Sequence, residues 1–180
     1  MIVQAKNGKS VFLRKLTFDD IDKLSNYLQN LSPDTTKRFG PHGFDKQSIS
    51  ELYQNPDQYA GYIAEDSDTA EIIAYSIVKR GYLEHDGYRL QSYGLKPDEK
   101  TDCTFAPSVA DQWQSQGVGN SLFHFMMSDL KAKGFRRVIL WGGVQSNNQK
   151  AVNYYLKNGF IKLGQFEHNG LNDDMILEIA

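Results

Sequence analysis

Cysteine, an excess of either charge and long apolar runs are all scarce in this sequence of 180 residues. Its single cysteine, Cys103, excludes an internal disulfide and a zinc site built on cysteines. The 20 Lys+Arg and 22 Asp+Glu leave a net charge of −2, so no basic excess points to a nucleic acid or an anionic membrane as partner. No stretch approaches the roughly 18 apolar residues of a membrane-spanning helix.

Histidine is also sparse and scattered. The spacing of His42, His85, His124 and His168 is not that of a metal site, so we expect no metal. The first residues carry no apolar run of the length that a signal peptide needs. With 40% hydrophobic and 23% charged residues, the composition is typical of a soluble globular protein. We therefore expect a cytoplasmic protein with a single domain over residues 1–180.

The apolar spacing predicts a mixed α/β domain. Helices are expected at 17–31, 46–54, 117–133 and 148–158, and strands at 11–16, 59–65, 71–79, 101–109, 138–141, 160–167 and 175–179. The polar segment 81–102 would be unusually long for a structureless loop, so an extra strand is expected over 88–93.

The segment Val109–Asn120 places Gly117 and Gly119 directly before a strongly periodic helix. Glycines let the backbone approach a ligand closely, and the N–H groups and dipole at a helix start favour an anion. Neither of two known phosphate loops matches, because the lysine of a Walker loop and the third glycine of a dinucleotide fingerprint are missing. The segment predicts a phosphate loop of another kind, with a plain turn as the alternative.

A second motif, N-x-x-A-x-x-x-Y-x-x-x-G-F, spans residues 148–160. It would occur by chance on the order of 10⁻⁴ times in a chain of this length. Preceded by Q-x-x-G-x-G over residues 114–119, it resembles the signature of the GNAT family of N-acetyltransferases. The specific match runs from Thr104 to Phe160, while segment 81–100 departs from the common pattern. The resemblance implies a single-domain GNAT fold: a central, mostly antiparallel mixed sheet, flanking helices, and splayed strands that form the acyl-CoA cleft. The cofactor core would cover about residues 101–160.

The resemblance also implies that acetyl-CoA is the co-substrate. Backbone amides of the loop would hold its pyrophosphate, from Gln114, Ser115, Gln116, Gly117, Val118, Gly119 and Asn120. The backbone near Val109 and Asp111 would pair with the pantetheine amides like an added strand. The side chain of Asn148 would contact the pantetheine arm or fix the loop.

Acetyl transfer to an amine needs a neutral amine and benefits from an acid for the departing thiolate. Tyr155 stands where the family's general acid stands; its alternative is a packing tyrosine beside Tyr154. The oxyanion of the reaction would be met by a backbone N–H near Val109.

The base is not identified from the sequence. Many relatives carry a glutamate on the strand before the loop, and residues 103–109 contain none. Thr104 and Ser108 could hold a relay water. Glu84, Asp86 and Asp111 are candidate bases, with solvated surface charges as the alternative.

The remaining residues carry weaker signals. Cys103 and Trp141 are interpreted as core residues. Phe39, His42 and Phe44 lie on an early loop that borders the acceptor pocket in the family fold, so they could touch substrate.

Two further readings compete with an N-acetyltransferase that acts on an amine of a small molecule, peptide or protein. One is a non-catalytic acyl-CoA sensor of the same fold. The other is an unrelated α/β protein that binds a different phosphate ligand. An exposed last strand could also pair in a homodimer.

Overall fold

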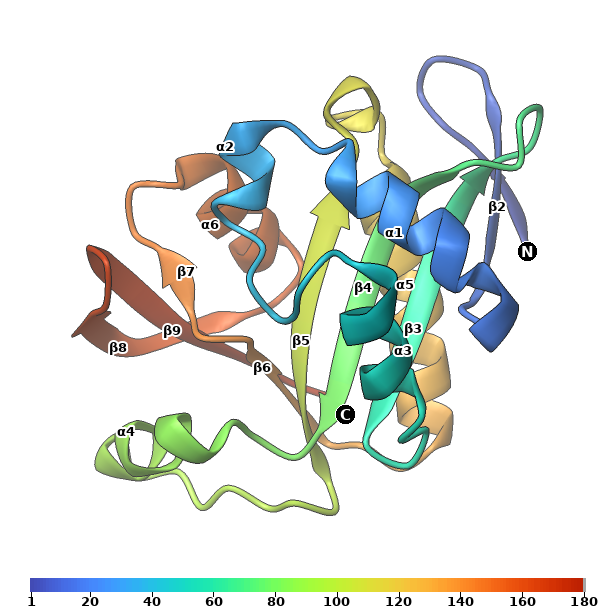
Figure 1. Ribbon diagram of the computed structural model, residues 1–180. Helices are drawn as coiled ribbons and strands as arrows, with labels where there is room; N and C mark the ends of the chain where they lie inside the picture. Colours follow the sequence, from blue (N-terminus) through green and yellow to red (C-terminus); the bar gives the residue numbers. More distant parts are fainter. Residues whose placement is uncertain (180) are drawn as a thin grey trace. The chain divides into compact units, whose positions relative to one another are not determined.

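The computed structural model describes residues 1–179 (Figure 1). Nine strands follow the hydrogen-bonded order β1-β2-β3-β4-β5-β6-β9-β7, and β8 pairs with β9. The strands are β1 (Ile2–Gln4), β2 (Ser10–Lys15), β3 (Tyr59–Asp66), β4 (Ile72–Arg80), β5 (Asp102–Val109), β6 (Arg137–Leu140), β7 (Val144–Gln145), β8 (Ile161–Glu167) and β9 (Leu171–Glu178). The helices are α1 (Ile21–Gln29), α2 (Pro33–Thr36), α3 (Lys46–Tyr53), α4 (Gly87–Ser92), α5 (Val118–Ala132) and α6 (Gln149–Lys157), with short 3₁₀ turns η1 (Phe18–Asp20), η2 (Glu84–Asp86) and η3 (Asp111–Trp113). Within this part of the chain, no helix has both the length and the apolar character to cross a membrane.

The chain forms two compact units. Unit 1 comprises residues 1–78 and 106–129, and unit 2 comprises residues 79–105 and 130–180. Each is described by itself below.

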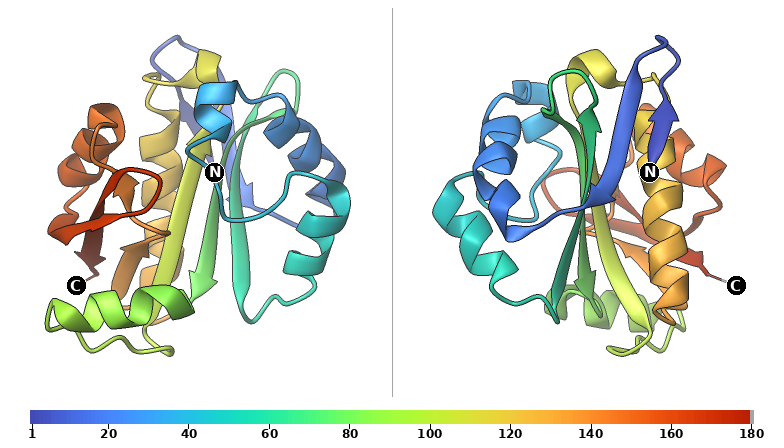
Figure 2. Two further views of the ribbon diagram at one scale, coloured as in Figure 1. Left: turned by 60° about the vertical axis from the view of Figure 1, so that its left-hand side comes forward. Right: turned by 90° about the vertical axis from the view of Figure 1, so that its right-hand side faces the viewer.

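In unit 1, strands β1 to β4 form antiparallel neighbours, with β1 on β2 and β2 on β3 in defined register. Figures 1 and 2 show α1 and α3 on one face of these strands and α5 on the other. Both faces of β3 and β4 are therefore covered, which explains their nearly continuous run of buried residues. On the α5 side, the Tyr62 hydroxyl donates to Asp129 at 2.6 Å.

In unit 2, β5 pairs with β6 in parallel over Asp102–Phe105, and β6 pairs with β9 antiparallel. The parallel pairing ends where Phe105 meets Leu140, although β5 continues to Val109. The end of this pairing agrees with the expectation of splayed strands, here β5 and β6. Arg89 of α4 holds Asp174 of β9 in an ion pair, and Phe105 stacks on Phe160.

The predicted mixed α/β architecture is confirmed, but the strand expected over residues 88–93 is wrong, and β1, α2 and β7 were not predicted. Residues 88–92 belong to helix α4 rather than to a strand, and Tyr93 follows as its C-cap. Asp86, Gly87 and Leu90 are buried at helical spacing, and Arg89 pairs with Asp86 one turn earlier at 2.7 Å.

The last strand is not exposed along its edges. Strand β9 pairs with β8 on one side and with β6 and β7 on the other. Because its backbone groups are used within the chain, β9 is unavailable as the dimer edge that the sequence suggested.

A buried ion-pair network ties β2 of unit 1 to its neighbours. Arg14 donates to both carboxylate oxygens of Asp20, at 2.6 and 2.7 Å, and to both of Glu65, at 2.9 and 2.7 Å. The hydrogen bond from Arg14 lowers the pKa of Asp20 to about 2, against the opposing effect of burial. The folded state therefore holds Asp20 ionised more strongly than the unfolded chain does.

We expect Asp20→Asn to lower the free energy of unfolding by about 2 kcal/mol near pH 7, since a pKa lowered from 3.8 to about 2 has that equivalent. Because the folded pKa is the lower one, this stability is present above about pH 4 and disappears as the pH falls toward 2. Urea unfolding at pH 7 and pH 3 measures the free energy of unfolding, and the loss caused by Asp20→Asn should be smaller at pH 3. Asp22→Asn is the control, because Asp22 is 74% exposed in its pair with Lys46. Equal losses in the two variants would contradict the assignment.

Candidate functional site

The glycine loop lies in unit 1, between η3 and the start of α5. Ser115 and Gly117 have φ of 63° and 87°, in the left-handed region that favours glycine. The first turn of α5 carries no acidic residue. A loop of this geometry turns successive N–H groups toward one side and leads into a helix N-terminus. It is therefore suited to bind an anion.

This loop is fixed to the β1–β2 connection and to the end of β5. The Lys6 N–H donates to the Gln116 carbonyl at 2.9 Å. A Cβ added at Gly119 would lie 3.1 Å from Val109 Cγ2, so a larger residue there would press on the end of β5. The Gln114 side chain donates to the Val109 carbonyl at 3.3 Å. Three of the predicted loop and strand residues, Gln114, Gly119 and Val109, are thus brought together at the end of β5.

Asp111 has a structural role that the sequence did not show. Its carboxylate accepts hydrogen bonds from the Ser32 N–H at 3.1 Å, the Ser32 hydroxyl at 2.8 Å and the Thr35 hydroxyl at 2.9 Å. Burial raises its pKa, but these hydrogen bonds outweigh that effect and leave the pKa lowered. Asp111 is exposed, and its hydrogen bonds join the start of α2 to the end of β5.

A pocket of about 360 Å³ lies beside this junction, entirely within unit 1. Helix α1 lines it with Asn26, Tyr27 and Asn30, and the chain after β5 contributes Ala110 and Asp111.

Helix α6 of unit 2 carries the second motif. Asn148 caps it, because its side-chain oxygen accepts from the Ala151 N–H at 3.3 Å. Tyr155 lies on the buried face with 8% of its surface exposed, and its ring contacts Tyr154 and Phe160. Burial raises the pKa of Tyr155, so its hydroxyl stays protonated at neutral pH. A protonated, barely exposed phenol is suited to donate a proton.

The structure places the sequence-derived candidates for the base in different settings. The Thr104 hydroxyl is buried and donates to the Gly81 carbonyl at 2.9 Å. The Ser108 hydroxyl lies 3.1 Å from that of Tyr27. Asp86 is buried against Arg89, contrary to the alternative of a surface charge.

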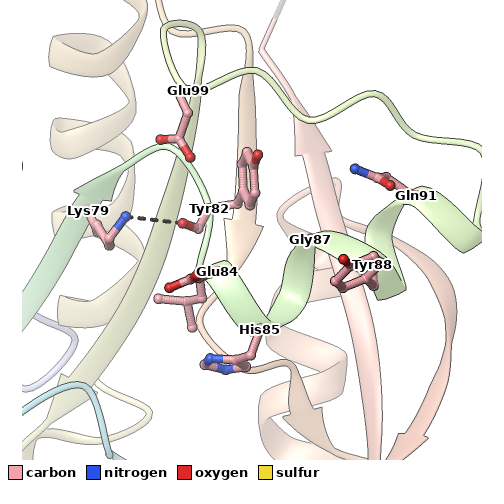
Figure 3. Close-up of a pocket in the computed structure, with 9 residues that line it drawn as sticks. Lys79, Tyr82, Glu84, His85, Gly87, Tyr88, Gln91 and Glu99 are labelled. Atoms are coloured by element: carbon pink, nitrogen blue, oxygen red, sulfur yellow. Dashed lines mark hydrogen bonds between the residues drawn. The ribbon is translucent and has the colours of Figure 1, made fainter.

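Glu84, the other candidate, lines a pocket of about 630 Å³ in unit 2 (Figure 3). The pocket is formed by the segment that departs from the family pattern, from Lys79 to Glu99, and includes Tyr82 and the exposed Tyr88. Lys79 donates to the Tyr82 carbonyl at 3.1 Å. Positive and negative groups thus share this pocket.

The early loop also carries a feature that sequence reasoning did not reach. His42 approaches Tyr75 of β4, which in turn approaches Tyr53 of α3. The three residues are widely separated along the chain, so no local spacing indicated their contact. Cys103 is buried, as expected of a core residue, and burial raises the pKa of its thiol.

The sequence and the fold of this chain are similar to those of known proteins. Residues 25–160 match the model of the acetyltransferase (GNAT) family. The chain is similar to the GNAT domain of PAT from S. lividans, with a TM-score of 0.73 at 17% identity, covering 99% of this chain and 96% of that one. It is similar to spermidine N-acetyltransferase from Vibrio cholerae in complex with CoA and spermine, with a TM-score of 0.67 at 18% identity over 94% and 95%. A Salmonella typhimurium structure with its cofactor acetyl-CoA gives a TM-score of 0.68 at 14% identity over 94% of each chain. No curated protein matches.

These similarities confirm the predicted fold, and the family match confirms the predicted class of enzyme, an acyltransferase dependent on acetyl-CoA.

Proposed function

Since this chain belongs to the acetyltransferase (GNAT) family, we propose that it transfers the acetyl group of acetyl-CoA to an amine, with Tyr155 as general acid. The observation that carries the proposal is the loop Gln114–Asn120, whose left-handed residues lead into the N-terminus of α5. Its backbone N–H groups offer donors to a pyrophosphate, together with the positive end of the helix dipole.

The remaining cofactor contacts are assigned to the predicted residues. The backbone of Val109 and of Asp111 would pair with the pantetheine amides, and Asn148 would contact the same arm or hold the loop. Gln114 already reaches the Val109 carbonyl, so cofactor pairing there requires the Gln114 side chain to give way or to bind alongside.

In the reaction, the neutral amine attacks the thioester carbonyl, and the oxyanion accepts a hydrogen bond from a backbone N–H near Val109. The C–S bond then breaks, and the thiolate of CoA takes the phenolic proton of Tyr155. The proton that the attacking nitrogen loses as the amide forms passes to solvent, and solvent returns a proton to the Tyr155 phenolate. Burial raises the pKa of Tyr155, so the residue enters the reaction as a neutral phenol.

The acceptor is an amine of a small molecule, peptide or protein. The Vibrio cholerae relative is named for spermidine, and another structure that resembles this chain is described as a phosphinothricin N-acetyltransferase. With a net charge of −2, this chain has no large acidic excess for a polycation. The first panel of candidate acceptor amines contains spermidine, phosphinothricin, amino acids and a lysine peptide.

Calorimetric titration with acetyl-CoA, followed by thiol release with this panel, tests the function. We expect binding, and thiol release with at least one amine. Binding without thiol release for any amine would favour the acyl-CoA sensor. Absence of binding at millimolar acetyl-CoA would overturn both readings.

A further inference from the structure

The turn between β1 and β2 of unit 1 presents a lysine, Lys6, at its first corner. The Gly8 N–H donates to the Ala5 carbonyl at 3.0 Å, and the Ala5 N–H donates to the Lys9 carbonyl at 2.9 Å. With φ of 81° at Gly8, these bonds are typical of a hairpin loop in which a type I turn is followed by a left-handed glycine. A type I turn does not itself use the backbone N–H at its first corner. The Lys6 N–H is therefore available to a neighbouring segment.

That neighbouring segment is the glycine loop. The Lys6 N–H donates to the Gln116 carbonyl at 2.9 Å. The stem of the Lys6 side chain lies beside the next residue of the loop, since a Cβ added at Gly117 would be 4.0 Å from Lys6 Cγ. Beyond Cγ the side chain is flexible and ends in a compact positive charge. It can therefore bring its ammonium group to an anion bound at the loop.

The charge of Lys6 is not neutralised by a carboxylate. Lys6 is exposed, and within residues 1–179 no Asp or Glu pairs with its ammonium group. Lys9, at the other end of the same turn, differs in this respect. Its Nζ lies 3.2 Å from the Asp66 carboxylate and 5.3 Å from the centre of the Trp113 ring. Of these two lysines, Lys6 is thus the one whose charge is available to a ligand.

The glycine loop has little positive charge of its own. Residues 114–120 include no Lys or Arg, and the start of a helix supplies only roughly half a positive charge. Asp111 adds a negative charge nearby, because its hydrogen bonds keep its pKa lowered and its Oδ1 lies 3.5 Å from Gln114 Nε2. Both phosphates of a diphosphate are ionised at neutral pH, so the loop alone leaves part of that charge unbalanced. Lysine is well suited to balance it as a point charge.

We infer that the Lys6 ammonium binds the diphosphate of acetyl-CoA and supplies the positive charge that the glycine loop lacks. This inference rests on the proposed function. It gives the β1–β2 turn, which precedes the family match over residues 25–160, a direct contact with the cofactor. The backbone of Lys6 holds the loop, and its side chain holds the ligand.

Lys6→Gln tests this role, because it removes the charge but keeps the backbone hydrogen bond to Gln116. We expect the Kd for acetyl-CoA to rise about 10-fold, as for the loss of a hydrogen bond to a charged group. The Kd of the variant should also depend less on salt concentration than that of the native protein. Lys9→Gln is the matched control: it removes the same charge from the same turn and should change the Kd less than about 2-fold. Calorimetric titration at two ionic strengths measures both effects.

The kinetic effect of Lys6→Gln should be confined to the binding of the cofactor. We expect the KM for acetyl-CoA to rise with the Kd, while kcat at saturating acetyl-CoA stays within about 2-fold of the native value. A lower kcat with an unchanged Kd would contradict a contact with the diphosphate.

Shortened ligands identify the group that Lys6 contacts. S-acetylpantetheine has no phosphate, so Lys6→Gln should leave its Kd unchanged within about 2-fold. Acetyl-dephospho-CoA lacks the ribose phosphate but keeps the diphosphate, so the rise of about 10-fold should persist. Equal rises in Lys6→Gln and Lys9→Gln, or a rise that vanishes with acetyl-dephospho-CoA, would overturn the inference while leaving the transferase intact. Absence of acetyl-CoA binding by the native protein would overturn the proposed function, and the role of Lys6 with it.

Discussion

Tyr155→Phe is expected to lower kcat for acetyl transfer about 10²-fold, the usual contribution of a positioned general acid. The substitution removes only the phenolic oxygen, so the ring contacts with Tyr154 and Phe160 remain. The thiolate of CoA must then leave without a proton or take one from water. Affinity for acetyl-CoA should stay within about 3-fold, because the loop in unit 1 is unchanged. Thiol release under saturating acetyl-CoA measures kcat, and calorimetry measures affinity.

Tyr154→Phe is the matched control for that experiment. Tyr154 is the preceding residue of α6, and burial raises its pKa in the same way. If Tyr155 is the acid, Tyr154→Phe keeps most of kcat, and both variants keep the free energy of unfolding within about 1 kcal/mol of the native value. Equal kcat in Tyr155→Phe and the native protein would assign Tyr155 to packing, the alternative that its burial alone permits.

The sequence predicted the elements that local signals define. Helix α5 and its loop were found because apolar residues repeat along one face and glycines stand at both ends. The hairpin β3–β4 was found because two apolar runs flank a short polar turn. In both cases the deciding interactions lie within the element or between direct neighbours in the chain.

The structure was not predicted where contacts between residues far apart in the sequence determine it. Helix α4 forms where an extra strand was expected only because the loop seemed too long, and its Arg89 pairs with Asp174, far along the chain on β9. The exposed Asp111 has partners that the sequence did not indicate, because Ser32 and Thr35 lie at the start of a helix that was not predicted. The contacts of Tyr75 with His42 and with Tyr53 join a strand to a loop and to a helix end. Spacing along one sequence carries no signal for such contacts.

The loop itself can be tested at one backbone position. Gly117 has φ of 87°, where a side chain is strained, although a Cβ would meet only Lys6 Cγ at 4.0 Å. Gly117→Trp should therefore reshape the loop and cover its N–H groups with an indole. We expect the Kd for acetyl-CoA to rise about 100-fold or more, which corresponds to about 2.7 kcal/mol.

Gly134→Trp separates this effect from backbone strain. Gly134 follows the other end of α5 with φ of 82°, and a Cβ there meets nothing within 4 Å. Both substitutions impose the same left-handed strain on a tryptophan, so both should lower the free energy of unfolding by about 1 to 2 kcal/mol. Only Gly117→Trp, at the position that precedes α5, should weaken the binding of acetyl-CoA, because the N–H groups that would face its pyrophosphate lie at that end of the helix. A Kd that rises equally in both variants would show that lost stability, rather than the loop, controls binding.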